Sequence, residues 1–91
     1  MTMISINRSQ RFEGEYKKFV KRNIPRAENI IKSLALFVLN PQHPSLNVEK
    51  LSGSNVWSMR LSEGNRLFFI WIGKDEIFLV DVGSHDKYKQ Y

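Results

Sequence analysis

Three short runs of aromatic and aliphatic residues dominate the second half of the chain. They cover residues 56–61, 66–72 and 76–82, and the sequences Ser-Glu-Gly-Asn and Gly-Lys-Asp separate them. Short runs of this composition with turn-forming residues between them are typical of antiparallel strands joined by tight hairpins. The pattern therefore predicts a three-stranded meander, around which the rest of the chain is organised.

The first half of the chain changes to helical periodicity after a short apolar opening at residues 3–6, which is consistent with an edge strand. Ser9 is in position to cap a first helix, and Pro25 suits the first turn of a second helix. The first helix has an apolar stripe at Phe12, Tyr16, Phe19 and Val20 and a basic outer side at Lys17, Lys18, Lys21 and Arg22. The second helix has its stripe within residues 27–38 and ends before Asn40-Pro41.

Together these elements predict a single α+β domain over residues 1–91, in the order β-α-α-β-β-β. Residues 42–47 form a surface connection that leads through residues 48–51 and a loop at 52–55 into the meander. Each helix has one apolar face, and so does the sheet. We therefore expect a helical hairpin packed on a small antiparallel sheet, with Trp57 and Trp71 on the core side.

The charge of the chain favours a polyanionic partner. Its 91 residues have a net charge of +5 and a pI near 9.8, which fits nucleic acid but also an acidic protein. The sequence contains no cysteine, and its two histidines make a poor metal site. No run is apolar and long enough for a signal peptide or a membrane span. We expect a cytoplasmic protein that needs no cofactor or metal.

The turns of the meander predict which side chains face one another. A three-residue loop, Ser62-Glu63-Gly64, with a positive φ at Gly64, would set Asn65 opposite Leu61 and Arg66 opposite Arg60. Like charges across a ladder are destabilising unless an anion or a carboxylate lies between them. A two-residue turn at Lys74-Asp75 would bring Asp81 to the face of Phe68 and Arg66. The sequence thus leaves two alternatives, an internal ion pair with Asp81 or a phosphate-binding face.

Several side chains near the end of the meander suit the cleavage of RNA without a metal. That reaction needs a base for the ribose 2′-hydroxyl, an acid for the leaving 5′-oxygen, and cations for the charge on the phosphoryl oxygens. Arg60 and Arg66 suit the cationic role, and His85 suits proton transfer because imidazole ionises near neutral pH. Tyr88 or Tyr91 could stack on a base or donate a proton, or could simply pack. Lys50 could contact phosphate.

The order and spacing of several short motifs resemble the RelE/ParE superfamily of bacterial type II toxins, and among them the RelE- and YafQ-like mRNA interferases. The motifs are the basic helical hairpin, Asn40-Pro41, Lys50-Leu51-Ser52-Gly53, Trp57-Ser58-Met59-Arg60, Gly64-Asn65-Arg66-Leu67-Phe68-Phe69 and Val82-Gly83-Ser84-His85. The similarity covers nearly the whole chain. It implies a small cytoplasmic toxin that an antitoxin holds inactive, with no membrane association.

The resemblance also implies roles for individual residues. His85 matches the catalytic histidine of YafQ-like ribonucleases, Arg66 the arginine that opens the third strand, and Arg60 a cationic position on the second strand. Ser58 stands where RelE has a second lysine, and the terminal aromatic is displaced to Tyr88 or Tyr91, so the base and the acid stay unassigned. Lys50, Lys87 and the helical Lys17, Lys18 and Lys21 would position RNA or the ribosome.

Three functions follow as expectations. The first is a metal-independent endoribonuclease toxin that cleaves mRNA, on the ribosome, and inhibits translation. The second is a non-enzymatic inhibitor of DNA gyrase, because ParE-like members of the superfamily lack the nuclease residues. The third is an interaction module without toxicity.

Overall fold

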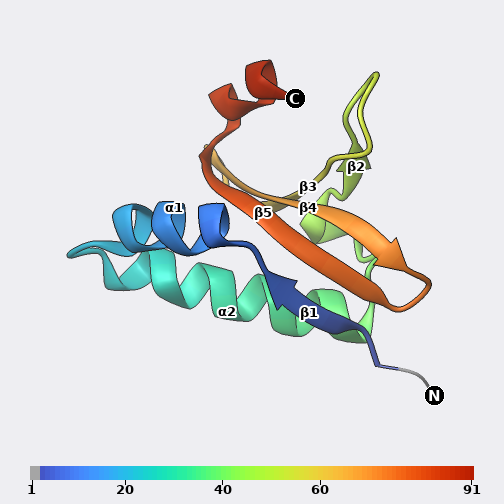
Figure 1. Cartoon of the computed structure of the whole chain (residues 1–91). Coiled ribbons are helices and arrows are strands. Elements are labelled where there is room, and N and C mark those ends of the chain that lie inside the picture. Colours follow the sequence, from blue (N-terminus) through green and yellow to red (C-terminus); the bar gives the residue numbers. More distant parts are fainter. Residues whose placement is uncertain (1–2) are drawn as a thin grey trace.

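The computed structural model describes residues 3–91 and contains a five-stranded sheet with helices on one face (Figure 1). The strands lie in the order β1-β5-β4-β3-β2. The chain runs through β1 (Ser5–Arg8), α1 (Gln10–Val20), α2 (Ile24–Leu39), the 3₁₀ turn η1 (Pro44–Leu46), β2 (Glu49–Lys50), β3 (Trp57–Ser62), β4 (Asn65–Gly73), β5 (Glu76–Ser84) and the 3₁₀ turn η2 (His85–Gln90). The predicted α+β architecture is confirmed, with β2 as an additional two-residue strand.

Both helices begin where local chemistry predicts. The Ser9 hydroxyl accepts a hydrogen bond from the N–H of Phe12, and the Asn23 side chain accepts one from the N–H of Arg26. These contacts satisfy N–H groups that the first helical turn leaves without a partner. Within residues 3–91, neither helix combines the length and the apolar character that crossing a membrane requires.

The core lies between the helices and one face of the sheet. β1 is an edge strand, as predicted, but it covers Ser5–Arg8 and not residues 3–6. It pairs in parallel with β5, so the sheet is mixed and not antiparallel throughout as predicted. Phe37 of α2 is fully buried and packs edge-on against Phe69 of β4, with ring centroids 5.2 Å apart. Trp57 and Trp71 pack against the same core, as predicted. The helices leave the other face of the sheet to the C-terminal segment, and we call this second face the open face (Figure 1).

The hairpin between β3 and β4 confirms one predicted pair and corrects another. Arg60 lies opposite Arg66, as predicted, but Asn65 pairs with Ser62 and not with Leu61. Leu61 is an extra residue on β3, and this bulge shortens the turn to Glu63 and Gly64. Gly53 is the glycine with positive φ in the described chain, so the predicted positive φ at Gly64 is wrong. The sequence predicted a three-residue loop that includes Ser62. In the structure Ser62 belongs to β3, and the extra residue of the hairpin is the bulge at Leu61.

The hairpin between β4 and β5 contains two bulges that cancel. Ile72 is the extra residue on β4 and Val80 the extra residue on β5, so that Phe68 pairs with Asp81 as a regular hairpin would have it. Between the bulges the register is shifted by one residue. The bulge at Val80 also reverses the alternation of faces, and Leu79 and Val82 therefore both enter the core. Asp81 between them points to the open face.

Candidate functional site

Two rows of side chains cross the open face over the adjacent strands β2, β3, β4 and β5. Each row follows from strand pairing, because residues directly opposite each other point to the same face of a sheet. The first row is Glu49, Ser58, Phe68 and Asp81, and the second row is Arg60, Arg66 and Gly83. The sheet thus sets the two arginines beside a line of polar and aromatic side chains.

Arg60 and Arg66, the guanidinium pair, have no carboxylate partner within residues 3–91. Arg60 is exposed. Arg66 is half-buried, and its Nη1 donates to the carbonyl oxygens of Ser62 and Asn65, both at 3.0 Å. These backbone contacts orient the guanidinium without neutralising it. Two adjacent uncompensated cations favour an anion at this position.

Tyr88 is the tyrosine that contacts the guanidinium pair. Its hydroxyl accepts a hydrogen bond from Nε of Arg66 at 3.1 Å and donates one to Oε1 of Glu49 at 3.2 Å. It also lies 3.1 Å from the hydroxyl of Ser58. The ring stands edge-on to Phe68, with centroids 5.7 Å apart. The phenol therefore connects a cation, a carboxylate and a hydroxyl that come from three different strands.

Glu49 was not among the residues that the sequence indicated. It belongs to the two-residue strand β2, where it is exposed and lies opposite Ser58. Only this pairing brings its carboxylate to Tyr88. The sequence signal for it would have been the register between β2 and β3, but two residues are too few to define a strand by periodicity.

His85 lies at the end of the sheet where the hairpin between β3 and β4 turns. Its backbone N–H donates to the carbonyl oxygen of Gly64 at 3.0 Å, one step beyond the pair of Asn65 with Ser84. The side chain is exposed, and Nε2 lies 3.6 Å from Oδ1 of Asp86. The imidazole is thus carried by a segment tied to the strand that holds Arg66.

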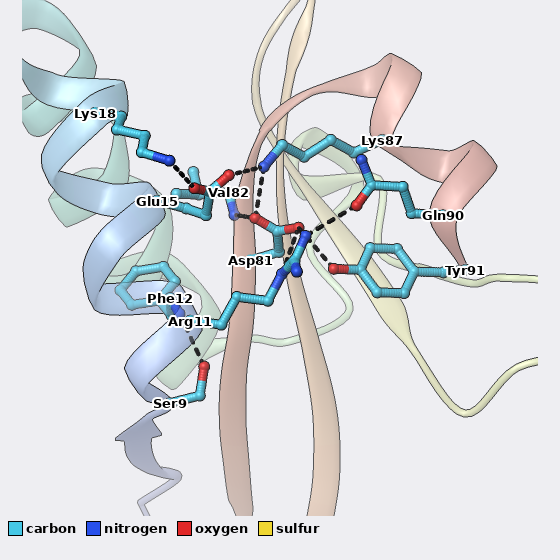
Figure 2. Close-up of polar contacts among 10 residues, drawn as sticks. All are labelled: Ser9, Arg11, Phe12, Glu15, Lys18, Asp81, Val82, Lys87, Gln90 and Tyr91. Atoms are coloured by element: carbon cyan, nitrogen blue, oxygen red, sulfur yellow. Dashed lines mark hydrogen bonds and ion pairs between the residues drawn. The ribbon is translucent and has the colours of Figure 1, made fainter.

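Asp81 is the centre of a second polar group on the open face, shown in Figure 2. Its side chain is fully buried. Lys87 Nζ lies 2.7 Å from Oδ1, while the Tyr91 hydroxyl at 2.6 Å and Arg11 Nη2 at 3.1 Å contact Oδ2. Lys87 also bonds Oε1 of Glu15 at 2.6 Å. We call these five residues the Asp81 cluster.

The Asp81 cluster corrects one sequence alternative. The internal ion pair between Asp81 and the guanidinium pair does not form, although Asp81 lies on the predicted face. The carboxylate is instead bonded by Arg11 of α1 and by Lys87 and Tyr91 of the C-terminal segment. Tyr91 belongs to this group through its hydroxyl, and its ring lies 5.4 Å from that of Phe68.

The contacts within the cluster determine its charge. Burial by itself raises the pKa of the Asp81 carboxyl, but hydrogen bonds from Lys87, Tyr91, Val82 and Arg11 outweigh it, so the pKa is lowered. Burial likewise opposes the charge of Lys87, but Asp81 and Glu15 raise its pKa. Burial and the hydrogen bond to Asp81 raise the pKa of Tyr91 to about 12. The carboxylate and the ammonium therefore stay charged inside the protein.

The predicted RNA-binding lysines lie in different places. Lys50 is exposed on β2, one residue after Glu49. Lys17 and Lys18 are exposed on α1, with Lys21 at the residue after the helix, and Lys18 pairs with Glu15 at 3.1 Å. These three belong to the helix layer and not to the open face. The Lys87 side chain is 19% exposed, because its ammonium is directed to Asp81 and Glu15.

Comparison with known proteins identifies the fold. No protein-family model matches the chain, and no curated protein matches it by sequence. Several solved structures match over most of their length. A YoeB/ParE toxin from Agrobacterium tumefaciens superposes with a TM-score of 0.76 at 15% identity, covering 90% of this chain and 99% of that chain.

Two further structures contain toxins bound to their antitoxins. The Escherichia coli DinJ-YafQ complex matches with a TM-score of 0.74 at 12% identity and covers 93% of this chain and 96% of the matched chain. The Staphylococcus aureus YoeB-YefM complex matches with a TM-score of 0.72 at 20% identity and covers 92% and 99%. At such identities the likeness establishes the fold. The chain has the fold of the RelE/ParE toxins, as the sequence predicted.

Proposed function

We propose that this protein is the toxin of a type II toxin-antitoxin system and that it cleaves RNA without a metal. The fold supports the first part, because solved structures with this fold include toxins in complex with the antitoxins DinJ and YefM. Its charge supports both parts, because a protein of net charge +5 suits an acidic antitoxin as well as RNA. We propose mRNA on the ribosome as the substrate.

The reaction that this site suits is attack of a ribose 2′-hydroxyl on the adjacent phosphorus. A base removes the 2′-hydroxyl proton, an acid protonates the leaving 5′-oxygen, and the products are a 2′,3′-cyclic phosphate and a free 5′-hydroxyl. The guanidinium pair would stabilise the charge that develops on the phosphoryl oxygens. Glu49 would act as the base, since an ionised carboxylate can only accept protons, and His85 as the acid.

One observation carries the proposal. Arg60 and Arg66 lie opposite each other and form no ion pair with a carboxylate of residues 3–91. The phenol of Tyr88 bonds Arg66 and links it to the carboxylate of Glu49, and His85 lies at the end of the sheet where the hairpin between β3 and β4 turns. A purely structural arginine pair would be expected to have an acidic partner in the protein. A phosphodiester would provide that partner.

The proposal is tested by incubating the purified protein with an mRNA positioned on ribosomes and, in parallel, with the same RNA free in solution. We expect fragments that end in 2′,3′-cyclic phosphate, and no cleavage of the same strand carrying 2′-deoxyribose at the scissile position. Arg60→Gln, Arg66→Gln, Glu49→Gln and His85→Ala should each lower the rate by roughly 100-fold or more. Glu13→Gln is the matched control, because it breaks only the exposed pair between Arg8 and Glu13.

Expression in bacteria adds a second test. The wild type should arrest translation, and His85→Ala should relieve the arrest while the far-ultraviolet circular dichroism of the protein stays unchanged. If the His85→Ala protein inhibits growth as strongly as the wild type, His85 has no part in the activity. DNA damage without an arrest of translation would overturn the nuclease proposal and indicate gyrase as the target.

A further inference from the structure

The C-terminal turn η2 carries two of the proposed site residues and rests on the sheet through the ring of Tyr88 and through polar contacts of its side chains. It contains six residues, and none of them is buried. A helix of this length is not stable by itself in water, so contacts with the rest of the protein must fix its position. Those contacts therefore decide where His85 and Tyr88 lie relative to the guanidinium pair.

The anchoring side chains alternate with the site side chains along η2. Lys87 is bonded to Asp81 and Glu15, and Gln90 accepts a hydrogen bond from Arg11 at 2.9 Å. Residues three apart in a 3₁₀ helix lie on the same side, so Lys87 and Gln90 form one side of the turn. His85 and Tyr88 form the next. Fixing the first side sets the rotation of the turn and therefore the direction of the second side.

Asp81 is the one group that these anchors share. It accepts hydrogen bonds from Lys87 and Tyr91 of the C-terminal segment and from Arg11 of α1, which itself holds Gln90 (Figure 2). Its carboxylate is fully buried, so its geometry is fixed by the sheet and not by solvent. Bonds to a buried carboxylate are stronger and more directional than exposed ion pairs.

We propose that Asp81 is a positioning residue for the RNA-cleaving site. Through Lys87 and Tyr91 it holds η2 so that the Tyr88 hydroxyl meets Nε of Arg66 and His85 stays at the end of β5, where its backbone N–H bonds the carbonyl oxygen of Gly64. Lys87 then acts on the reaction from inside the protein, and not by binding RNA. The inference rests on the proposed function, because it concerns the geometry of that same site.

The test compares Lys87→Gln and Lys87→Arg with the wild type in the RNA cleavage assay. Glutamine removes the cation from Asp81 but is close in length, whereas arginine keeps the charge and can still donate to the carboxylate. For Lys87→Gln we expect kcat to fall roughly 10- to 100-fold with KM changed less than about threefold, since a shift of about 1 Å in a catalytic group has an effect of this size. Lys87→Arg should restore most of kcat, and Glu13→Gln should match the wild type.

Tyr91→Phe provides a milder second variant, in case Lys87→Gln does not fold. It removes the hydroxyl that bonds Asp81 at 2.6 Å and keeps the ring that packs on Phe68. We expect kcat to fall at least about threefold at a temperature where circular dichroism shows a folded protein, with KM unchanged. A loss confined to kcat in a folded variant is not what a purely structural role would produce.

The outcomes separate this inference from the proposed function. A wild type that cleaves no RNA would overturn the proposed function, and the positioning role with it. An active wild type whose folded Lys87→Gln and Tyr91→Phe variants keep the same kcat would overturn the positioning role alone. A rise in KM for Lys87→Gln with kcat unchanged would do the same and would identify Lys87 as an RNA contact.

Discussion

Replacing Gly83 with alanine should destabilise the protein through Lys87 and not through the backbone. Gly83 lies on β5 opposite Arg66, and its φ is outside the left-handed region, so the backbone accepts an alanine. A Cβ at this position would lie 2.6 Å from Cε of Lys87 and 3.0 Å from its Cδ. The lysine side chain crosses Gly83 on its way to Asp81 and would have to move.

The magnitude follows from the contacts that Lys87 would lose. Hydrogen bonds to charged groups each contribute about 1.5–3 kcal/mol. Asp81 would keep Arg11 and Tyr91, and Glu15 would keep Lys18, so we take about 2 kcal/mol for both contacts together. Alanine in place of glycine returns about 0.5 kcal/mol by restricting the unfolded chain. The net loss of about 1.5 kcal/mol corresponds to a fall in Tm of about 6–12 °C for a domain of this size.

The assay is a double-mutant cycle measured by urea unfolding, with tryptophan fluorescence as the signal. Gly83→Ala is compared in the wild type and in a Lys87→Ala background. We expect a loss of about 1.5 kcal/mol in the first and a gain of about 0.5 kcal/mol in the second, a coupling of about 2 kcal/mol. An equal loss in both backgrounds would show that Gly83 matters for a reason other than Lys87, and would refute the reasoning.

Three further predictions concern stability. The pKa values of Asp81 and Glu15 are lowered on folding. The two carboxylates therefore add to the free energy of unfolding above about pH 4, and this contribution is lost as the pH falls through the lower folded values. Urea unfolding between pH 7 and pH 2 should show the loss, and the free energy of unfolding of Asp81→Asn should depend less steeply on pH. Tyr91 should ionise at about pH 12, later than the about pH 10 of an unperturbed tyrosine, so its raised pKa stabilises the protein at lower pH and that contribution disappears as the pH rises through the folded value. An ultraviolet titration checks this, and persistence of the late step in Tyr91→Phe would contradict it. Phe37→Ala should cost about 3–5 kcal/mol because the ring is fully buried, whereas Leu39→Ala on the same helix, at 80% exposed, should change the free energy of unfolding by less than about 0.5 kcal/mol; similar losses in the two variants would contradict the placement of the core.

Local chemistry determined the elements of this fold and their order. Ser9 and Asn23 cap the two helices because the N–H groups they satisfy lie three residues away. The runs of apolar residues identified the meander, and the turn lengths read from the sequence predicted Arg60 opposite Arg66 and Phe68 opposite Asp81, the pairs that the structure shows. Both pairs depend on bulges that the sequence did not indicate: the bulge at Leu61 compensates for a turn one residue shorter than predicted, and the bulges at Ile72 and Val80 cancel.

The site itself depends on contacts between residues that are distant in the sequence. Arg11 and Asp81 are separated by 70 positions, and Glu49 and Tyr88 by 39. Neither contact leaves a periodic pattern or a turn signal, so the sequence could not indicate Glu49, nor show which tyrosine lies at Arg66. The same holds for Lys87, whose direction depends on a carboxylate on β5 and on another on α1.

The sequence alone thus determined the helices, the strands and their order along the chain, because backbone propensity, capping and turn-forming residues act over a few residues. Tertiary structure decided which carboxylate meets which cation. A single inserted residue in a strand exchanges its two faces, and only the packing of the helices and the C-terminal segment on the sheet decides which partner reaches a buried charge.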